Sequence, residues 1–467
     1  MLPSRAALLL VLAPLAACGS SSSEATPTPP ASTSESPDGG GPPPPIVDGA
    51  FQLTVPSGKL LLMRGRTTPL TITLDRSSGY TGMVSITLAG APEGVSAERM
   101  DIPAGSTTGV MQIVVAARAS QGDLTGVTLE GRATGLATQS LPLSAYVRGQ
   151  PGEPDLTFGE NGDAKGIGSL AFAMDAKGRL LASKNNSSSF ARFTADGAPD
   201  TTFQPATLPV LGVSQLAVVG DKIYACGDGP KVLVVRLTEA GAIDTTYANG
   251  AGKVEIDKAG GTFYGCFFSS LGNAAVSFMS GGQRQLAWVD ADGKVSAPSI
   301  VNEALDSRSA VLDGALLTGK AEITKLVRVK VGSIYDLIFG KPDLGGSVLD
   351  VALAPSSFDV FALTSTNVVR IGTNGTKIGS FSSALQLLPS TIGGVLTFQK
   401  DGKLLVATNE DGGGRITRLL PTGALDTPFG IGGSTPITFA RFVAVQPDGR
   451  IVVVAIEGLP VRRYWGD

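Results

Sequence analysis

Three cysteines, a large set of carboxylates and no histidine define the chemistry open to this 467-residue chain. Histidine is the usual general base near neutral pH and the commonest metal ligand in proteins. Its absence excludes Ser-His-Asp and Cys-His catalysis, together with zinc sites that use imidazole. Chemistry based on carboxylates or calcium remains open, and a binding function needs none of these groups.

Sequence motifs for metal, phosphate or nucleophile chemistry are incomplete. Asp290-Ala291-Asp292-Gly293 begins like a calcium loop, but no third oxygen ligand and no later bidentate glutamate follow. Asp-Gly is also ordinary turn chemistry. The glycine-rich segments 159–162 and 430–433 lack the Gly-x-Gly-x-x-Gly spacing that leads into a phosphate-binding helix. We therefore expect no catalytic residue, no metal and no cofactor.

The N-terminus has the order of a bacterial export signal. Arg5 precedes an apolar run, Ala6 to Ala17, that is too short to span a bilayer as a helix. The run ends in Leu15-Ala16-Ala17-Cys18-Gly19, which resembles the lipobox of bacterial lipoproteins. The resemblance implies removal of residues 1–17, a diacylglycerol on the Cys18 thiol and acylation of the new amine. The alternative is an ordinary signal peptide with a chance cysteine.

Residues 18–49 would form the tether between the lipid and the folded protein. Serine, threonine, proline and glycine dominate this segment, and such a composition cannot bury enough apolar surface to order itself. As a coil it reaches roughly 30 Å. Gly19, in place of an aspartate after the cysteine, favours sorting to the outer membrane. We therefore expect a lipoprotein of the bacterial cell envelope, facing the periplasm or the cell surface.

Residues 50–149 alternate apolar and polar positions over several short stretches, for example Leu70-Thr71-Ile72-Thr73-Leu74. Turn residues separate these stretches, and about seven strands in about 100 residues match the size of a β-sandwich. The segments Gly79–Gly82 and Gly90–Val95 resemble bacterial surface Ig-like domains. The resemblance implies an Ig-like β-sandwich that acts as a spacer or adhesion module.

Residues 150–467 repeat the same cues with a period of about 45 residues. The recurring cues are two apolar strands around an Asp/Gly/Asn turn, then an Arg-apolar pair, and an Asp-x-x-Phe motif or close variant; some units lack one of them. Seven such units, with room for four strands each, predict a seven-bladed β-propeller. The best copies, Leu425–Gly430 and Gln446–Val452, resemble the delta-60 repeat of bacterial propellers. That family carries no agreed activity, so the resemblance implies a fold and a compartment only.

The two ends of the repeat region predict how the propeller closes. Residues 154–158 carry the motif that other units place in their last strand, whereas the last unit stops after its third strand. Pairing of 154–158 with 461–465 would complete that unit and remove exposed sheet edges. We therefore expect the N- and C-terminal strands of the propeller to close the circle.

An arginine and an aspartate recur eight residues apart on either side of a Gly turn. This spacing makes the two side chains cross-strand neighbours on a hairpin. Trp288 and Ser296 replace both members in one unit, and Ile378 faces Arg370 in another. The matched acids favour a structural ladder of ion pairs over the alternative, a ring of ligand-binding arginines. The predicted pairs are Arg192 with Asp200, Arg236 with Asp244, Arg328 with Asp336, Arg418 with Asp426 and, through closure, Arg463 with Asp155.

Cys226 and Cys266 are the cysteines outside the leader, and they lie in adjacent units. In an oxidising compartment such a pair can form a disulfide. Two buried free thiols are the alternative.

The composition and the motifs together favour binding over catalysis. The formal net charge is −3, which leaves no basic footprint for nucleic acid. We expect a non-enzymatic, monomeric module, anchored through acylated Cys18, that displays a propeller face to a protein or glycan. The alternative is a lactonase-like propeller hydrolase that depends on carboxylates or calcium at the central channel.

Overall fold

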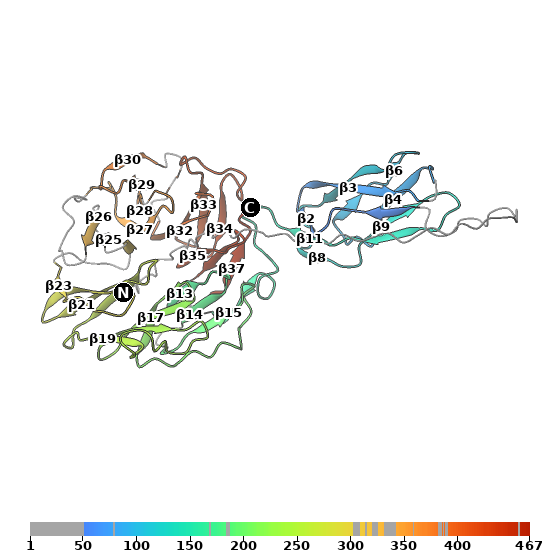
Figure 1. Cartoon of the computed structure of the whole chain (residues 1–467). Coiled ribbons are helices and arrows are strands. Elements are labelled where there is room, and N and C mark those ends of the chain that lie inside the picture. The colour runs from blue at the N-terminus through green and yellow to red at the C-terminus, as the bar shows by residue number, and fades with distance from the viewer. Residues whose placement is uncertain are drawn as a thin grey trace, which may run out of the picture. The chain divides into compact units, whose positions relative to one another are not determined.

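The computed structural model in Figure 1 describes residues 51–77, 80–167, 170–183, 187–301, 309–312, 315–319, 326–330, 342–357, 359–381, 385, 387, 391–455 and 458–467. Every regular element among these residues is a β-strand, so the protein is all-β. The described residues divide into an N-terminal unit that ends at Arg148 and a C-terminal unit that begins at Gly149. Cys18 and the expected tether lie outside the described residues.

The N-terminal unit contains two antiparallel four-stranded sheets and one three-stranded sheet among its described residues. The first sheet has the order β1 (Gln52–Thr54), β3 (Thr67–Asp75), β7 (Thr108–Val115), β5 (Val95–Ala97). The second has the order β10 (Gln139–Pro142), β9 (Thr128–Arg132), β4 (Val84–Ala89), β6 (Met100–Ile102). The third has the order β2 (Leu60–Met63), β11 (Ala145–Arg148), β8 (Gly122–Leu124).

Alternating side chains of the two four-stranded sheets share one apolar core. Leu70, Ile72 and Leu74 of β3 are buried, whereas the residues between them are exposed. Val84 and Ile86 of β4 belong to the same core. The period of two follows from the pleat, which sends successive side chains to opposite faces of a strand.

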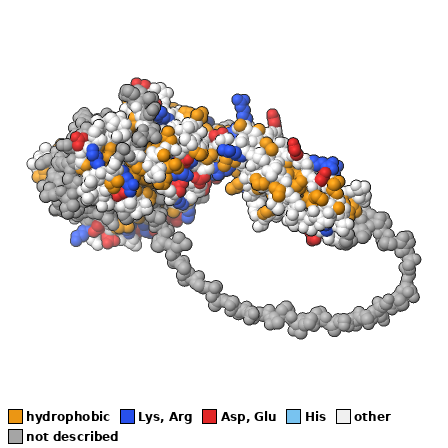
Figure 2. Space-filling view, turned by 90° about the horizontal axis from the view of Figure 1, so that it is seen from above, with side chains coloured by type: hydrophobic (Ala, Val, Ile, Leu, Met, Phe, Trp, Pro, Cys, Tyr) orange, Lys and Arg blue, Asp and Glu red, His pale blue; other side chains and the backbone are white. Residues whose placement is uncertain are grey.

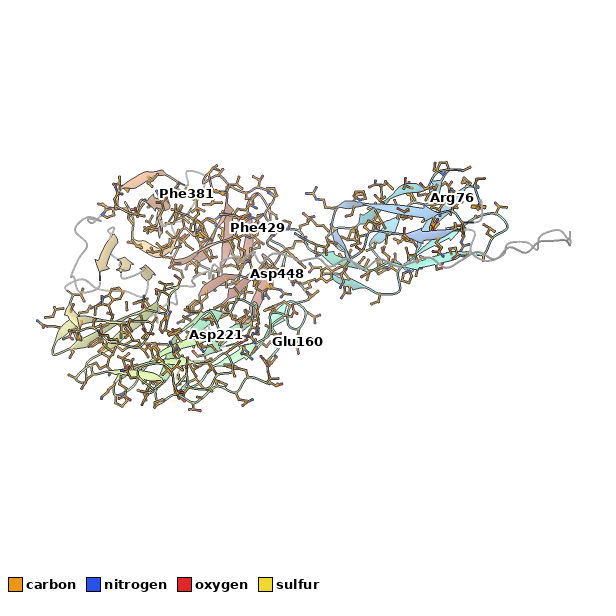
Figure 3. All side chains as sticks on the ribbon, in the orientation of Figure 1. Arg76, Glu160, Asp221, Phe381, Phe429 and Asp448 are labelled. Carbon is orange, nitrogen blue, oxygen red and sulfur yellow. The ribbon has the colours of Figure 1, made fainter. Side chains whose placement is uncertain are left out.

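Arg76 ties together the loops at one end of the N-terminal unit (Figure 3). Its guanidinium donates to the carbonyl oxygens of Gly82, Pro103 and Ser106 at 2.6, 2.9 and 2.7 Å. The guanidinium also lies 5.7 Å from the centre of the Tyr80 ring. One side chain therefore holds three carbonyl groups that no strand pairs.

Seven antiparallel sheets are described in the C-terminal unit, and each contains three or four strands. In chain order of their first strands, they are β13 (Ala171–Met174), β14 (Leu180–Ser183), β15 (Ala191–Phe193); β16 (Gly212–Val219), β17 (Lys222–Asp228), β18 (Val232–Leu237), β19 (Lys253–Ile256); β20 (Phe263–Phe268), β21 (Ala274–Ser280), β22 (Gln283–Val289), β23 (Ser299–Ile300); β24 (Ser309–Leu312), β25 (Ala315–Gly319), β26 (Leu326–Lys330); β27 (Val348–Leu353), β28 (Val360–Thr364), β29 (Val368–Ile371), β30 (Lys377–Ser380); β31 (Gly393–Phe398), β32 (Leu404–Glu410), β33 (Gly413–Leu419), β34 (Ser434–Ile437); and β35 (Phe442–Val445), β36 (Ile451–Val454), β37 (Val461–Tyr464), β12 (Asp163–Ala164).

The sheets of the C-terminal unit follow one another around a circle (Figure 1). The first strand of each sheet lies beside the first strand of the next, from β13 and β16 to β31 and β35. Phe442 of β35 stacks on Phe172 of β13, with ring centres 5.8 Å apart. Second strands such as β28 and β36 are buried on both faces. Because each sheet packs against two neighbours, these strands are continuously apolar rather than alternating.

The N- and C-terminal segments of the C-terminal unit are hydrogen-bonded to each other. β12 pairs with β37, where Asp163 lies opposite Arg462. Pro154 forms a bridge with Tyr464, and the Asp155 amide donates to the Arg463 carbonyl at 2.8 Å. The closing contact is therefore present at residue 154, but its regular strand is Asp163–Ala164 rather than the expected 154–158.

The displaced strand has a local cause. The Asp155 carboxylate accepts hydrogen bonds from the amide and hydroxyl of Thr157 at 3.1 and 2.6 Å. The Phe158 amide donates to the Asp155 carbonyl at 3.2 Å. Side-chain bonds of this kind turn the backbone two residues on. The motif at 155–158 is consequently a turn that buries Phe158, and the strand forms only after it.

Candidate functional site

The arginine and the aspartate of the repeated hairpins are brought together wherever both residues are described. In three hairpins, and at the closing contact between Asp155 and Arg463, the aspartate amide donates to the arginine carbonyl, which makes the two residues cross-strand neighbours. The distances from arginine Nε to aspartate Oδ2 are 2.7 Å for Arg192 and Asp200, 2.9 Å for Arg236 and Asp244, 2.8 Å for Arg418 and Asp426, and 2.8 Å for Arg463 and Asp155.

The remaining predicted positions differ from this pattern. Asp336 lies outside the described residues, so the pair with Arg328 is not described. Trp288 and Ser296 keep the hairpin without an ion pair, since the Ser296 amide donates to the Trp288 carbonyl at 2.8 Å. Arg370, which lacks an aspartate eight residues on, pairs instead with Asp359 at 2.6 Å.

The arginines of the four described ion pairs with aspartate also bond to the following sheet. Nη1 donates to a backbone carbonyl just after the third strand of the next sheet: Arg192 to Glu239, Arg236 to Ala291, Arg418 to Gly466, and Arg463 to Ala195. The guanidinium lies over the aromatic ring of its own Asp-x-x-Phe motif, for example 4.3 Å from the Phe203 centre for Arg192. One arginine therefore fixes its own hairpin, an aromatic ring and the neighbouring sheet.

Two of the aspartates, Asp200 and Asp244, have a pKa below the usual value because several groups bond to them. The hydroxyl of Thr202 and the guanidinium of Arg192 lower the pKa of Asp200 to about 2. Burial opposes ionisation of Asp244, but hydrogen bonds from Thr246 and the charge of Arg236 outweigh burial and lower its pKa to about 2. These two carboxylates are therefore held in structural ion pairs with Arg192 and Arg236.

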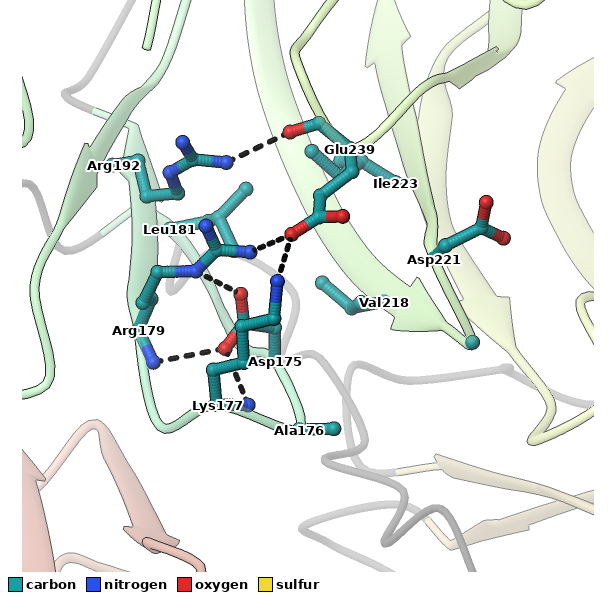
Figure 4. A pocket seen from close by; sticks show the side chains of 11 residues that line it. Asp175, Ala176, Lys177, Arg179, Leu181, Arg192, Val218, Asp221, Ile223 and Glu239 are labelled. Atoms are coloured by element: carbon teal, nitrogen blue, oxygen red, sulfur yellow. Dashed lines mark hydrogen bonds and ion pairs between the residues drawn. The ribbon is translucent and has the colours of Figure 1, made fainter. Parts of the chain in front are cut away.

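A cavity of about 150 Å³ lies between the sheet β13–β15 and the sheet β16–β19 (Figure 4). Its apolar walls are Leu181, Val218 and Ile223, and the glycine of the β16–β17 turn, Gly220, also lines it. Five charged side chains surround these walls: Asp175, Lys177, Arg179, Asp221 and Glu239. Arg192 of the ion-pair ladder contributes one further side.

The charges around the cavity are paired across the two sheets. Arg179 contacts Asp175 of its own hairpin and Glu239 of the next sheet, each at 2.6 Å. Lys177 Nζ also lies 2.6 Å from Glu239 Oε1. The hydrogen bonds from Lys177 and Arg179 lower the pKa of Glu239 to about 2. The rim is therefore charged but balanced.

Sequence reasoning missed this cavity, although a signal was present in the repeat. Gln399 and Gln446 precede the first turn of their sheets, whereas Asp175 stands at that position in the first sheet. Gln446 bonds to Gly178 and Ala195 of the next sheet. Asp175 instead forms an ion pair with Arg179, which also contacts Glu239 of the next sheet. A break in the repeat pattern marks the residues around the cavity.

Cys226 and Cys266 are both buried, and both are free thiols in the structure. They belong to one apolar cluster between β17 and β20. Burial raises the pKa of the Cys226 thiol, and the neighbouring Cys266 thiol raises it further. A thiol of this kind is a poor nucleophile, because the thiolate is the reactive form.

Asp290 acts as a turn residue, since its carboxylate accepts bonds from the amides of Asp292 and Lys294 at 3.0 and 2.8 Å.

Within the described ranges, no group of three or more acidic, cysteine or histidine residues is placed to hold a metal ion. The same ranges hold no helix that is long and apolar enough to cross a membrane. Acidic and basic side chains are interspersed over the face shown in Figure 2.

Comparison with known proteins identifies the repeat architecture. The family model "Domain of unknown function (DUF5122) beta-propeller" matches residues 182–203 and 399–429, which contain two of the Arg–Asp hairpins. The chain is therefore a β-propeller repeat protein. No curated protein matches the sequence.

Solved structures of low sequence identity also match. Virginiamycin B lyase from Staphylococcus aureus is 14% identical, with a TM-score of 0.43, over 65% of this chain and 97% of the lyase. The dihydro-heme d1 dehydrogenase NirN is 12% identical, with a TM-score of 0.39, over 77% of this chain and 74% of that enzyme.

Proposed function

We propose that this protein is a non-enzymatic binding or scaffolding module, anchored by lipid in the bacterial cell envelope. Acylated Cys18 would hold it in the membrane, and residues 19–49 would separate the folded units from the lipid headgroups. The observation that carries the proposal is Leu15-Ala16-Ala17-Cys18-Gly19 at the end of a short apolar run. Two or more acyl chains at one cysteine provide stable anchoring, which a single chain does not.

The proposal includes a finer architecture. The two four-stranded sheets of the N-terminal unit would form an Ig-like β-sandwich, supported by their shared apolar core. The C-terminal unit would be a seven-bladed propeller of the delta-60 type. The circular succession of sheets and the pairing of β12 with β37 support this assignment.

Binding is favoured over catalysis by the way the repeated carboxylates are used. Asp155, Asp200 and Asp244 each bond to an arginine and to a threonine within their own motif. A carboxylate acting as a general base must instead reach the proton that it removes from a substrate. The repeated acids thus support a rigid frame that presents its loops to a partner.

Metabolic labelling with an alkyne-bearing fatty acid tests the anchor. In a bacterial host, the wild-type chain should carry the label in the membrane fraction, and Cys18→Ala should carry none. Cys226→Ala is the matched control and should keep the label. A labelled Cys18→Ala protein, or an unlabelled wild-type protein in the soluble fraction, would overturn the anchoring proposal.

Crosslinking on intact cells tests the binding role, because it should capture the partner. Protease treatment of the same cells tests which side of the membrane the protein faces: the protease should remove the protein if it faces outward and leave it intact if it faces the periplasm. Calcium-dependent hydrolysis of lactones by the purified full chain would contradict a purely binding role.

A further inference from the structure

We propose that the cavity between the sheets β13–β15 and β16–β19 is a ligand site, and that it accepts an uncharged aromatic ring from the side chain of a protein partner. This inference rests on the proposed binding function and names the chemistry of the partner. Five observations carry it: the cavity walls, a register comparison with the next pair of sheets, the space beside the turn glycines, the length of one turn, and the charge balance at the rim.

The size and the walls of the cavity suit one small ring. A cavity of about 150 Å³ that is lined by aliphatic side chains has the size that holds a benzene molecule. The apolar part of the lining here is Leu181 and Ile223, which are 1% and 3% exposed, and the half-buried Val218; charged side chains form the rest. None of these three side chains offers a hydrogen bond to a sugar hydroxyl, and the charged side chains around them already form ion pairs, so the lining favours an aromatic side chain over a glycan.

The next pair of sheets fills the corresponding volume with its own aromatic ring. Leu181 is paired with Arg192 in the first sheet, and Tyr224 is paired with Arg236 at the same register position of the second. The Tyr224 ring is buried, and its centre lies 5.6 Å from that of Phe268 in the third sheet. Where the second sheet carries a ring, the first carries only a leucine.

The turn glycines show the same contrast. A Cβ atom added to Gly272 would lie 2.6 Å from the Tyr224 hydroxyl oxygen, and one added to Gly178 would lie 3.2 Å from Pro447. A Cβ atom added to Gly220 would meet no atom within 4 Å. The space beside Gly220 is therefore open, although the spaces beside the other two turn glycines are filled by the preceding sheet.

A short turn contributes to this space. Val219 of β16 pairs with Lys222 of β17, so that only Gly220 and Asp221 connect the two strands. In the next sheet, Phe268 pairs with Ala274, so the connection between the strands is longer. The leucine and the short turn together leave the cavity open to a ring from outside the chain.

The charges at the rim favour a neutral ligand. Lys177 and Arg179 are balanced by Asp175 and Glu239, and Asp221 lies 3.4 Å from Lys222. A charged ligand would have to compete with these pairs. An aromatic ring instead gains from a nearby guanidinium, which is attracted to the face of the ring.

The test is a cavity-filling variant, Leu181→Tyr, made in the full chain. The second sheet already holds a tyrosine at this register position, so the variant supplies the ring that the ligand would otherwise bring. The control is Leu211→Tyr, the same change at a leucine that is 72% exposed and does not line the cavity. Val218→Phe fills the cavity from the opposite wall. It serves as the test variant if Leu181→Tyr fails to fold, and it should lose binding in the same way.

The probe is N-acetylphenylalaninamide, with N-acetylglycinamide and N-acetylglucosamine as comparisons, and binding is measured by ligand-observed NMR. We expect the wild type and Leu211→Tyr to bind the phenylalanine derivative alone. Affinity should fall about tenfold or more in Leu181→Tyr, about 1.4 kcal/mol of binding free energy. The partner crosslinked on intact cells should be lost in the same variant. Unchanged binding in the folded filling variants, or binding of the sugar instead, overturns the inference. The lipid-labelling experiment tests the anchor at Cys18 separately, so a failure of the cavity inference leaves the anchoring proposal unchanged.

Discussion

Replacement of Asp155 by alanine should open the contact that joins the two ends of the C-terminal unit. Asp155 is fully buried, and its partner Arg463 is 1% exposed. The change removes the 2.8 Å contact with Arg463 and the two bonds from Thr157. It leaves a buried guanidinium with weaker compensation, because Asp196, its other acidic contact, is itself largely exposed.

The expected cost follows from that burial. Removal of one partner from a buried ion pair costs about 3–5 kcal/mol. Because Arg463 keeps its contacts with Asp196 and the Ala195 carbonyl, we expect the lower end, about 3 kcal/mol, or roughly a hundredfold change in the folding equilibrium constant. Glu160→Ala removes an acid from the same segment. Its pair with Lys165 is highly exposed on both sides, so the unfolding free energy should not change measurably.

Urea unfolding followed by tryptophan fluorescence measures the effect in the relevant unit. The chain contains two tryptophans, Trp288 and Trp465, and both lie in the C-terminal unit. The double variant Asp155→Ala, Arg463→Met should recover part of the loss, because it removes the uncompensated charge. The reasoning is refuted if Asp155→Ala costs no more than Glu160→Ala.

The other predictions concern the hairpins, acid stability and the cysteines. Gly241 has a φ of 91°, and an added Cβ atom would lie 2.8 Å from Pro205. Gly241→Ala should therefore destabilise the protein by about 1–3 kcal/mol more than Gly260→Ala, since Gly260 has a φ of 74° but open space around it; equal chemical-denaturation midpoints would contradict the close approach. Asp200 and Asp244 have pKa values near 2 in the folded protein and 3.8 as the ordinary value. Their contribution to stability should be complete above about pH 4 and lost as the pH falls to about 2; an unfolding free energy that stays flat across this range would show that the pairs contribute nothing. Cys226 and Cys266 should resist maleimide in the native protein and react after denaturation without reductant; a requirement for reductant would reveal a disulfide instead.

Local patterns allowed much of the C-terminal unit to be anticipated. The eight-residue spacing of Arg192 and Asp200 encodes a pair because a hairpin turn alone brings the two residues together. Ile378 stands eight residues after Arg370, where the other hairpins carry an aspartate, so the sequence predicted no pair of this spacing there. Arg370 pairs instead with Asp359, which precedes it in the sequence. The closing contact at Pro154 was also visible in the sequence, whereas the turn at Asp155 moved the regular strand to Asp163–Ala164.

The sequence by itself determined the all-β character, the repeat and the hairpin pairs, because each depends on residues that are close along the chain. Only the tertiary structure decided what lies between successive sheets. The bond from Arg192 to the Glu239 carbonyl, and the cavity left beside Leu181, both depend on how side chains from different sheets fill a shared volume. No spacing within one repeat encodes that volume, since it is set by the packing of one sheet against the next.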